Sequence, residues 1–294
     1  MSDSITFDGN TPPPASPPPV SDAPAGHAPG SLVYRHKLAT RLWHWTNVVA
    51  VLVMLMSGLM IFNAHPRLYW GDYGATFDPA WLVIGHANER GFLQLGNTVI
   101  DTTGWLGRWT DPDGNVQNRA FPWWATIPSD YNLALARRWH LFFAWIFAFG
   151  LLFFMLGSLF NRHFQKDLAF RREELKPGHI WADIKDHLKL KFHNPHNPLS
   201  FNILQKFSYV GVIFILLPLI IFTGLAMSPA MVASWPFLNE VFGGRQSARS
   251  IHFIAAMLIA GFILLHLALV VLAGPYNEVR SMITGKFRLP KEQH

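Results

Sequence analysis

The sequence predicts an all-α integral membrane protein, built as a bundle of four transmembrane helices with a long loop between the first two. Of its 294 residues, 50% are apolar and only 14% are charged, whereas about a quarter of a soluble domain is charged. Four apolar segments, roughly 39–62, 135–160, 203–227 and 249–273, each exceed the approximately 20 residues that cross a bilayer. The net charge of +6 comes from segments between these runs, which favours a membrane surface over nucleic acid as its partner.

The chain before the first span divides into a tail and the start of the membrane domain. Residues 1–30, with the run TPPPASPPPVSDAPAG, hold too little apolar material to fold and are predicted to be a disordered, Pro-rich cytoplasmic tail. Residues 31–294 are assigned to the membrane domain. The chain has no Cys, which excludes disulfides, thiolate-held zinc, iron–sulfur clusters and c-type haem. Redox chemistry therefore needs a cofactor with other ligands.

The four spans are expected to be helices, because lipid offers backbone groups no other partner. The first span follows Arg35, Lys37 and Arg41, and the second opens with the sequence RRWHLFF. Pro218 lies inside the third span and is expected to kink it without breaking it.

The distribution of Lys and Arg predicts the orientation of the spans. The 161–200 connection carries eight Lys and Arg, whereas the 63–134 connection carries four against seven acidic residues. By the positive-inside rule, both termini and the 161–200 connection are predicted to be cytoplasmic. The loop of about 70 residues between the first two spans then faces outward, and a loop of that length is usually functional or a docking surface. Its many Trp residues fit an aromatic belt, a docking surface or a mixture of both.

Four of the fourteen histidines lie within the spans, namely His44, His140, His252 and His266. An ionisable residue in a span costs free energy and indicates a function. Given the alternating span directions, His140 and His252 lie near the outer side, and His44 and His266 lie nearer the inner side. His252 and His266, both in the fourth span, are fourteen residues apart, about 21 Å along a helix and within about 40° of one face. We therefore expect two layers, each with a pair of histidines.

Two neutral imidazoles that face each other across a bundle are the ligands expected for a six-coordinate haem, a centre suited to electron transfer. The alternative for each histidine alone is a boundary residue with a hydrogen-bonded neighbour. The anionic propionates need cations, and Arg137 and Arg138 suit the outer haem, whereas Arg35, Lys37 and Arg41 suit the inner one. Each of these cations could equally be an interfacial anchor.

Several motifs resemble a bacterial membrane di-haem cytochrome b of the type that anchors nickel–iron hydrogenase, formate dehydrogenase and thiosulfate reductase. The matching pieces are RLWHW and SGLMIF in the first span, RRWHLFFAW in the second, FNILQKFSY and FTGL in the third, and SIHFIAAMLIAGFILLHLALV in the fourth. The resemblance covers roughly residues 35–280, apart from much of the long loop. It implies that His44, His140, His252 and His266 ligate two b-type haems, which agrees with the depth argument. It also implies a bacterial inner membrane protein.

The resemblance further implies a quinone, ubiquinone or menaquinone, beside the inner haem. The corresponding segment at the start of the third span offers Asn202, Gln205 and Lys206, and Asn202 could instead be a helix N-cap. In the inner connection, His193 and His196 suit either a proton path to the quinone or, more simply, a solvated basic loop. We expect His65 and His86 to be structural.

A stretch in the long loop, HPRLYWGDYG at 65–74, is similar to the thiosulfate-reductase branch, whose cytochromes accompany a periplasmic molybdopterin oxidoreductase. The sequence thus predicts transmembrane electron transfer, through two b-type haems, between such a periplasmic partner and the membrane quinone pool. Two alternatives are a self-sufficient quinone oxidoreductase that reacts at its outer haem with a small species such as superoxide, and a structural anchor or transporter without haem. The long Trp-rich loop would be superfluous for a small diffusible reactant.

Overall fold

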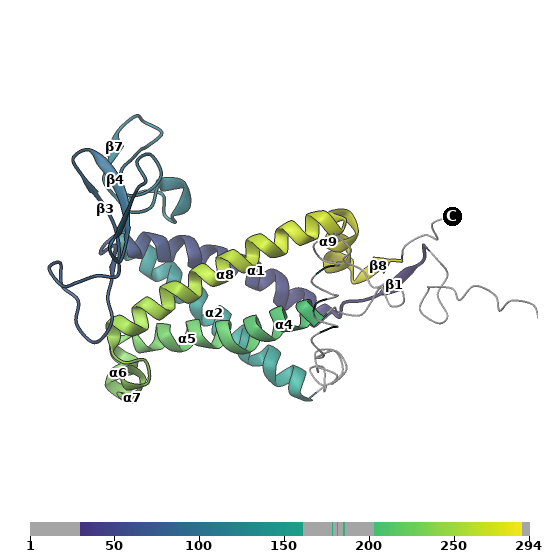
Figure 1. The fold of residues 1–294 in the computed structure, drawn as a ribbon. Helices are drawn as coiled ribbons and strands as arrows, with labels where there is room; N and C mark the ends of the chain where they lie inside the picture. Colours follow the sequence, from purple (N-terminus) through teal and green to yellow (C-terminus); the bar gives the residue numbers. More distant parts are fainter. Residues whose placement is uncertain (1–29, 161–177, 179–180, 182–184, 186–202, 290–294) are drawn as a thin grey trace, which may run out of the picture.

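A computed structural model describes residues 30–160 and 203–289, together with the isolated residues 178, 181 and 185. The predicted tail, residues 1–29 of it, lies outside this description. Four helices are long and apolar enough to cross a membrane, at Leu38–Phe62, Leu133–Phe160, Lys206–Ala226 and Arg245–Ala273. They run alongside one another as an elongated bundle (Figure 1). The predicted four-helix membrane fold is confirmed, with bounds within four residues of those expected.

The third span consists of three consecutive helical segments. These are α4 (Ile203–Gly211), the π-helical η3 (Val212–Leu216) and α5 (Leu217–Ala226). Pro218 lacks a backbone N–H and crowds the carbonyl four residues earlier. A wider π turn directly before it accommodates that conflict. The helix therefore continues past Pro218, as expected.

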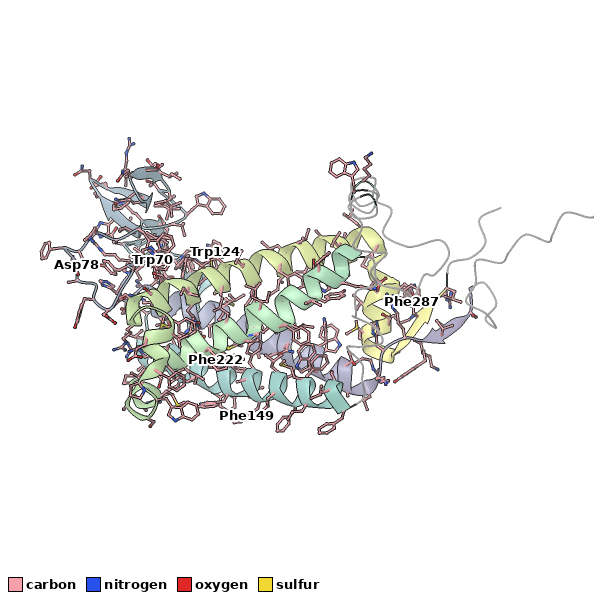
Figure 2. The ribbon with its side chains drawn as sticks, turned by 60° about the horizontal axis from the view of Figure 1, so that its bottom comes forward. Trp70, Asp78, Trp124, Phe149, Phe222 and Phe287 are labelled. Atoms are coloured by element: carbon pink, nitrogen blue, oxygen red, sulfur yellow. The ribbon has the colours of Figure 1, made fainter. Side chains whose placement is uncertain are left out.

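The bundle is formed by two helix pairs. Helix α1 (Leu38–Phe62) packs against α2 (Leu133–Phe160), and α5 packs against α8 (Arg245–Ala273). Buried residues from all four spans meet at its centre: Ala50, Phe147, Leu151, Leu217 and Ile259. Many large apolar side chains are exposed instead, and Phe149 and Phe222 lie on the outside of the helices (Figure 2). An exposed apolar surface of this extent is what lipid requires.

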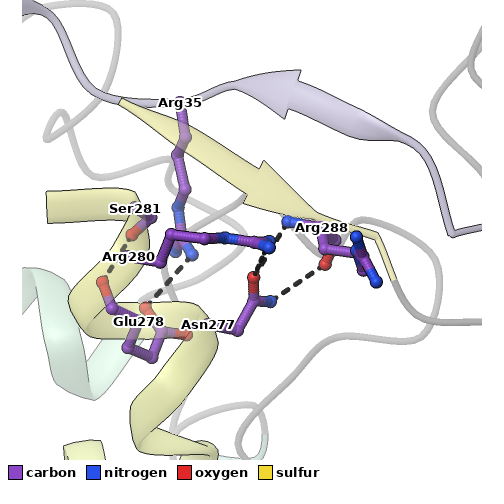
Figure 3. A network of polar contacts seen from close by, with 6 residues as sticks. All are labelled: Arg35, Asn277, Glu278, Arg280, Ser281 and Arg288. Atoms are coloured by element: carbon purple, nitrogen blue, oxygen red, sulfur yellow. Dashed lines mark hydrogen bonds and ion pairs between the residues drawn. The ribbon is translucent and has the colours of Figure 1, made fainter. Parts of the chain in front are cut away.

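The two ends of the described chain meet at one end of the bundle, here called the terminal end. Strand β1 (Leu32–Tyr34) pairs antiparallel with β8 (Lys286–Arg288), and α9 (Pro275–Thr284) packs beside them. In Figure 3, the side chain of Asn277 joins the side chain of Arg280 to the backbone of Arg288 at 2.9 Å each. Arg35 and Glu278 form an ion pair at 3.5 Å. The segments before α1 and after α8 are thus held together.

His36, next to this ion pair, gives the terminal end a pH dependence. Burial, with a further contribution from Arg35, lowers the pKa of His36 from 6.5 to about 4, although Glu278 opposes the shift. Because the folded pKa lies below the unfolded one, the stabilisation is present above pH 6.5 and is lost as the pH falls towards 4. We expect the unfolding temperature to drop less between pH 7 and pH 5 in His36→Gln than in the unaltered chain. Equal drops in the two proteins would contradict this.

The long loop, to which the all-α prediction assigns no strands, folds into a small β domain at the opposite end, here called the loop end. Strands β2 (Arg67–Leu68), β3 (Leu82–Ala87), β4 (Arg90–Leu95) and β5 (Thr98–Asp101) form one antiparallel sheet in that order. Strands β6 (Trp109–Thr110) and β7 (Val116–Gln117) form a second. Asn88 and Glu89, with φ of 47° and 62°, make the two-residue turn between β3 and β4, the geometry typical of tight hairpins.

The β domain has its own small core, which continues into the helices. Phe62 at the end of α1 packs with Leu68, Leu82, Ile84 and Ala120 of the loop. Phe253 of α8 joins this cluster, and its ring lies 4.7 Å from that of Phe62. The remaining short helices of this end are η1 (Trp123–Ala125), α6 (Pro229–Ser234) and α7 (Phe237–Val241). The loop is therefore seated on the bundle (Figure 1).

Hydrogen bonds attach residues 65–81 of the loop to the first turns of α8. The carbonyl of Gly71 accepts the backbone N–H groups of Gln246 and Ser247 at 2.9 and 3.1 Å, so it caps donors that a helix start leaves free. Ser250 donates to the carbonyl of Tyr69 at 2.6 Å and accepts from the indole of Trp81 at 2.9 Å. These contacts fix the loop within two turns of His252.

Candidate haem sites

The four histidines of the spans lie in two pairs, one at each level of the bundle. The rings of His140 on α2 and His252 on α8 have centroids 6.3 Å apart, with an angle of 57° between their planes. The rings of His44 on α1 and His266 on α8 have centroids 6.4 Å apart, at 60°. The structure brings together the same partners that the depth argument paired. We call them the loop-end pair and the terminal-end pair.

The separation within each pair fits one metal ion between two imidazoles. Two metal–nitrogen bonds of about 2 Å, plus about 1 Å from each nitrogen to its ring centre, give about 6 Å. The observed separations are 6.3 and 6.4 Å. Within the described parts of the chain, no group of three or more His, Cys, Asp or Glu could hold a metal ion. A donor set of two histidines suits haem iron, whose other four ligands come from the porphyrin.

The ring of His140 is oriented by helix α1. Its Nδ1 lies 3.0 Å from the carbonyl oxygen of Met54 and 3.2 Å from the hydroxyl of Ser57. A carbonyl oxygen can only accept, so Nδ1 carries the proton. The hydroxyl of Ser57 donates to the carbonyl of Val53 at 2.6 Å, and its oxygen is thereby left as an acceptor for His140. This arrangement leaves Nε2 as the nitrogen that can bind iron.

Helix α5 orients His252 in the same way. The Nδ1 of His252 lies 3.0 Å from the hydroxyl of Thr223, and the ring also hydrogen-bonds to the backbone of Ile220. Thr223 donates to the carbonyl of Leu219 at 2.7 Å, which is the offset of four residues that Ser57 uses on α1. Both rings of the loop-end pair are therefore held through Nδ1 by a neighbouring helix.

A glycine beside each hydroxyl makes room for the ring. A Cβ atom added at Gly58 would lie 3.3 Å from Cε1 of His140, and one at Gly224 would lie 3.4 Å from Cε1 of His252. Side chains larger than alanine at these positions would reach into the space that the rings occupy. The dipeptides Ser57-Gly58 and Thr223-Gly224 thus form equivalent cradles on α1 and α5.

The terminal-end pair has different surroundings. The Nδ1 atom of His44 is buried and has no hydrogen-bond partner among the residues that the structure describes. The ring of His266 stacks on Phe262 with centroids 6.0 Å apart. A buried, unpaired imidazole nitrogen is costly in an apolar bundle, and a bound ligand or water would satisfy it.

The cations predicted to serve haem propionates have varied positions. Arg137 and Arg138 are exposed in the second turn of α2, on the side of the loop-end pair. Arg41 donates to the carbonyl of Ile283 in α9, and Arg35 pairs with Glu278. Lys37 is exposed. All five lie at the expected end of the bundle, and their role towards a propionate stays a prediction.

The predicted quinone residues lie at the edge of the described chain. Asn202 falls outside it, as do His163, His179, His187, His193 and His196 of the inner connection. Gln205 belongs to α4, but its side chain is not described. Lys206 is 8% exposed, so this ammonium is buried at the terminal end of the third span.

Two histidines of the loop have structural contacts. His65 hydrogen-bonds and stacks with Tyr69, at 3.2 Å between ring nitrogen and hydroxyl, and burial lowers its pKa. His86 lies in β3. Neither belongs to a ring pair.

Sequence reasoning missed the two hydroxyl residues that orient the loop-end pair, Ser57 and Thr223. Gly58 and Gly224 beside them are recognisable from the sequence as small residues that allow close helix or cofactor approach. A signal was present, because Ser-Gly-Leu in the first span recurs as Thr-Gly-Leu in the third. Without known helix contacts, these small residues could equally have served helix packing.

Comparison with known proteins gives a consistent result. Residues 35–285 match the prokaryotic cytochrome b561 family. The chain is similar to a putative protein-methionine-sulfoxide reductase subunit YedZ1 of Azospira oryzae, at 27% identity over 79% of this chain and 87% of the relative. It is also similar to a probable Ni/Fe-hydrogenase B-type cytochrome subunit of Rhodobacter capsulatus, at 20% identity over 86% of this chain and 80% of the relative. No solved structure matches.

The family match extends over all four membrane helices and both ring pairs. Membership of this family agrees with the membrane fold. It also agrees with histidines as the candidate cofactor ligands in a chain that has no cysteine. Both relatives are named as subunits of redox complexes. The chain belongs to the prokaryotic cytochrome b561 family, whose members are multi-pass bacterial membrane proteins that carry haem b and transfer electrons across the membrane.

Proposed function

We propose that this chain transfers electrons through two b-type haems between a periplasmic oxidoreductase and the quinone pool of the bacterial inner membrane. The loop-end pair, His140 and His252, would hold one haem, and the terminal-end pair, His44 and His266, would hold the other. The observation that carries the proposal is the separation within both pairs, 6.3 and 6.4 Å, which suits a single iron between two imidazoles. A haem with two histidine ligands supplies one-electron transfer and no open coordination site.

The protein's own part in this function is to position ligands and exclude water. The four histidines are spread over α1, α2 and α8, so the ring pairs form only when the helices assemble. The two levels are fourteen residues apart on α8, about 21 Å along the helix axis. That separation places one pair towards each membrane surface. Electrons can then cross most of the apolar layer between two fixed sites.

The orientation we propose places both termini in the cytoplasm and the β domain in the periplasm. The excess of Lys and Arg in the 161–200 connection supports it. The pairing of β1 with β8 supports the placement of both termini on one side of the membrane, because residues near both termini lie at the same end of the bundle. Quinone exchange would then take place at the terminal end, near Asn202, Gln205 and the buried Lys206.

The partner would dock at the loop end. An ordered loop there exposes two aromatic side chains, with Tyr73 88% and Phe77 99% exposed. The loop is held by a hydrogen bond of 2.6 Å between the Asp78 carboxylate and the Ala75 N–H, and Asp78 lies at its far edge in Figure 2. Exposed aromatic residues on a fixed loop are typical anchors of protein interfaces. Nearby carboxylates, such as Asp72, disfavour insertion into lipid.

Two lines of evidence bear on the identity of the partner. The 65–74 stretch resembles cytochromes that accompany a molybdopterin oxidoreductase. The Azospira relative is named as a subunit of a protein-methionine-sulfoxide reductase. We propose a periplasmic oxidoreductase of one of these kinds. Superoxide as a direct reactant stays the alternative, and the folded, aromatic loop favours a protein partner over it.

The first test is to count haem in the purified protein after haem-replete expression. A pyridine haemochrome spectrum and a protein assay are expected to give two b-type haems per polypeptide. Addition of a reduced short-chain quinone such as ubiquinol-1 is expected to reduce the haem. A colourless protein would refute the proposal and favour a structural anchor or a transporter. If haem is present but does not react with the quinol, the proposed electron exchange with quinone is refuted, whereas the proposed haem sites are not.

A further inference from the structure

The loop-end pair is held by two side-chain hydroxyls that occupy equivalent positions on two different helices. Ser57 on α1 and Thr223 on α5 are both fully buried, with 0% exposure. Each hydroxyl donates to the carbonyl four residues earlier in its own helix, at 2.6 and 2.7 Å. Each lies within 3.0 to 3.2 Å of the Nδ1 of a histidine on a neighbouring helix.

The direction of these hydrogen bonds follows from the groups involved. The single proton of each hydroxyl is directed to its own helix carbonyl, so its oxygen accepts from the imidazole. For His140, the carbonyl of Met54, 3.0 Å from Nδ1, can also only accept. Both rings are thus in the tautomer with the proton on Nδ1. Their Nε2 atoms are left for a metal.

Hydrogen bonding at Nδ1 changes the metal-binding nitrogen as well. An acceptor at the Nδ1 proton increases the electron density of the ring and raises the basicity of Nε2. A more basic ligand stabilises oxidised over reduced iron, which lowers the reduction potential. The terminal-end pair differs at His44, because its Nδ1 has no hydrogen-bond partner within the described residues.

We propose that Ser57, which acts beside the carbonyl of Met54, and Thr223 are positioning residues that hold His140 and His252 in the Nδ1-protonated tautomer and lower the reduction potential of the haem at the loop end. This inference rests on the proposed function, in which the two histidines are haem ligands. The hydroxyls make the loop-end haem a stronger electron donor to the second haem. They therefore act on the transfer of electrons across the bilayer without touching substrate.

The experiment is a spectropotentiometric titration of the purified full-length holoprotein in detergent. The variants are Ser57→Ala, Thr223→Val and the double variant, which remove the hydroxyls with little change in volume. The chain also offers a matched control, Ser158→Ala, because Ser158 is a buried serine of α2, 6% exposed, with no hydrogen bond to any of the four histidines among the residues described. The variants Ser57→Thr and Thr223→Ser keep a hydroxyl at each position.

In the unaltered chain, we expect two one-electron components. In Ser57→Ala and in Thr223→Val, one component is expected to move to a higher potential while haem content and the second component stay unchanged. The double variant should show a larger shift of the same component. The control and the two hydroxyl-retaining variants should titrate as the unaltered chain does.

Three results would overturn the inference: no shift in the double variant, an equal shift of both components, or the same shift in the hydroxyl-retaining variants. Each hydroxyl is also removed singly. If one single variant fails to fold, the redox titration of the other still tests the inference. Loss of the proposed function is a separate result, because an unaltered chain without haem would refute both. Haem present at unchanged potentials in the variants would refute only the role of Ser57 and Thr223.

Discussion

Replacement of His252 by alanine is expected to remove one of the two haems, and replacement of His266 is expected to remove the other. The two residues lie on the same helix, but each faces a different ring, that of His140 at 6.3 Å and that of His44 at 6.4 Å. One imidazole alone cannot complete the axial coordination of a six-coordinate haem. Haem counted per polypeptide should therefore fall from two to one in each single variant. The double variant should be colourless.

A suitable control for these changes is His65→Ala. His65 lies outside the spans and hydrogen-bonds to Tyr69 at 3.2 Å, so it should keep both haems. The two single variants should also differ from each other, because each retains a different component in a redox titration. If neither change lowers the haem content, the assignment of the ligands is wrong.

The helices and the histidine levels could be predicted because they depend on properties local to the sequence. A membrane span is defined by its own length and apolarity, and all four spans have bounds within four residues of those expected. The levels of His44, His140, His252 and His266 follow from helix rise and span direction alone. Histidines at the same depth in the membrane could then be paired across helices.

The β domain could not be predicted in the same way. Its longest strands, Leu82–Ala87 and Arg90–Leu95, have six residues, and the rest have two to four. The burial pattern of β5 is exposed throughout, so it lacks the alternation that identifies a strand. The turn between β3 and β4 uses Asn88-Glu89, which lacks the glycine that usually marks such a turn.

The hydroxyl residues beside the loop-end pair were missed for a different reason. Ser57 and Thr223 contact histidines that are 83 and 29 residues away in the chain. A serine or threonine within an apolar helix normally satisfies its hydroxyl on its own backbone, and both residues do so. Their second contact depends on which helix lies beside them. Only the assembled bundle shows that both face a histidine.

The attachment of the loop to α8 connects the two functional regions of the molecule. The contacts of Gly71, Tyr69 and Trp81 reach α8 at residues 246–250, directly before His252. The exposed Tyr73 belongs to the same segment of the loop. A partner bound there would lie against the end of the helix that carries one ligand from each pair. The loop would therefore combine the proposed docking surface with support for the loop-end pair.

Replacement of Gly224 by leucine is expected to abolish the haem at the loop end and to preserve the haem at the terminal end. Even the Cβ atom would lie 3.4 Å from Cε1 of His252 and 3.8 Å from its Nδ1. The rest of the leucine side chain has to displace the ring or the helix, and overpacking of this kind costs about 1–3 kcal/mol. Displacement of the ring also breaks its contact with Thr223. Haem content should fall from two to one per polypeptide.

Gly157→Leu is the matched control for this change. Gly157 is also a glycine within a membrane helix, but an added Cβ there would meet nothing within 4 Å. This variant should keep both haems, whereas Gly58→Leu, next to His140, should behave as Gly224→Leu does. If Gly224→Leu retained both haems at unchanged potentials, His252 would not need the position that the structure gives it. The loop-end ring pair would then lose its support as a haem site, even though the helices remained assembled.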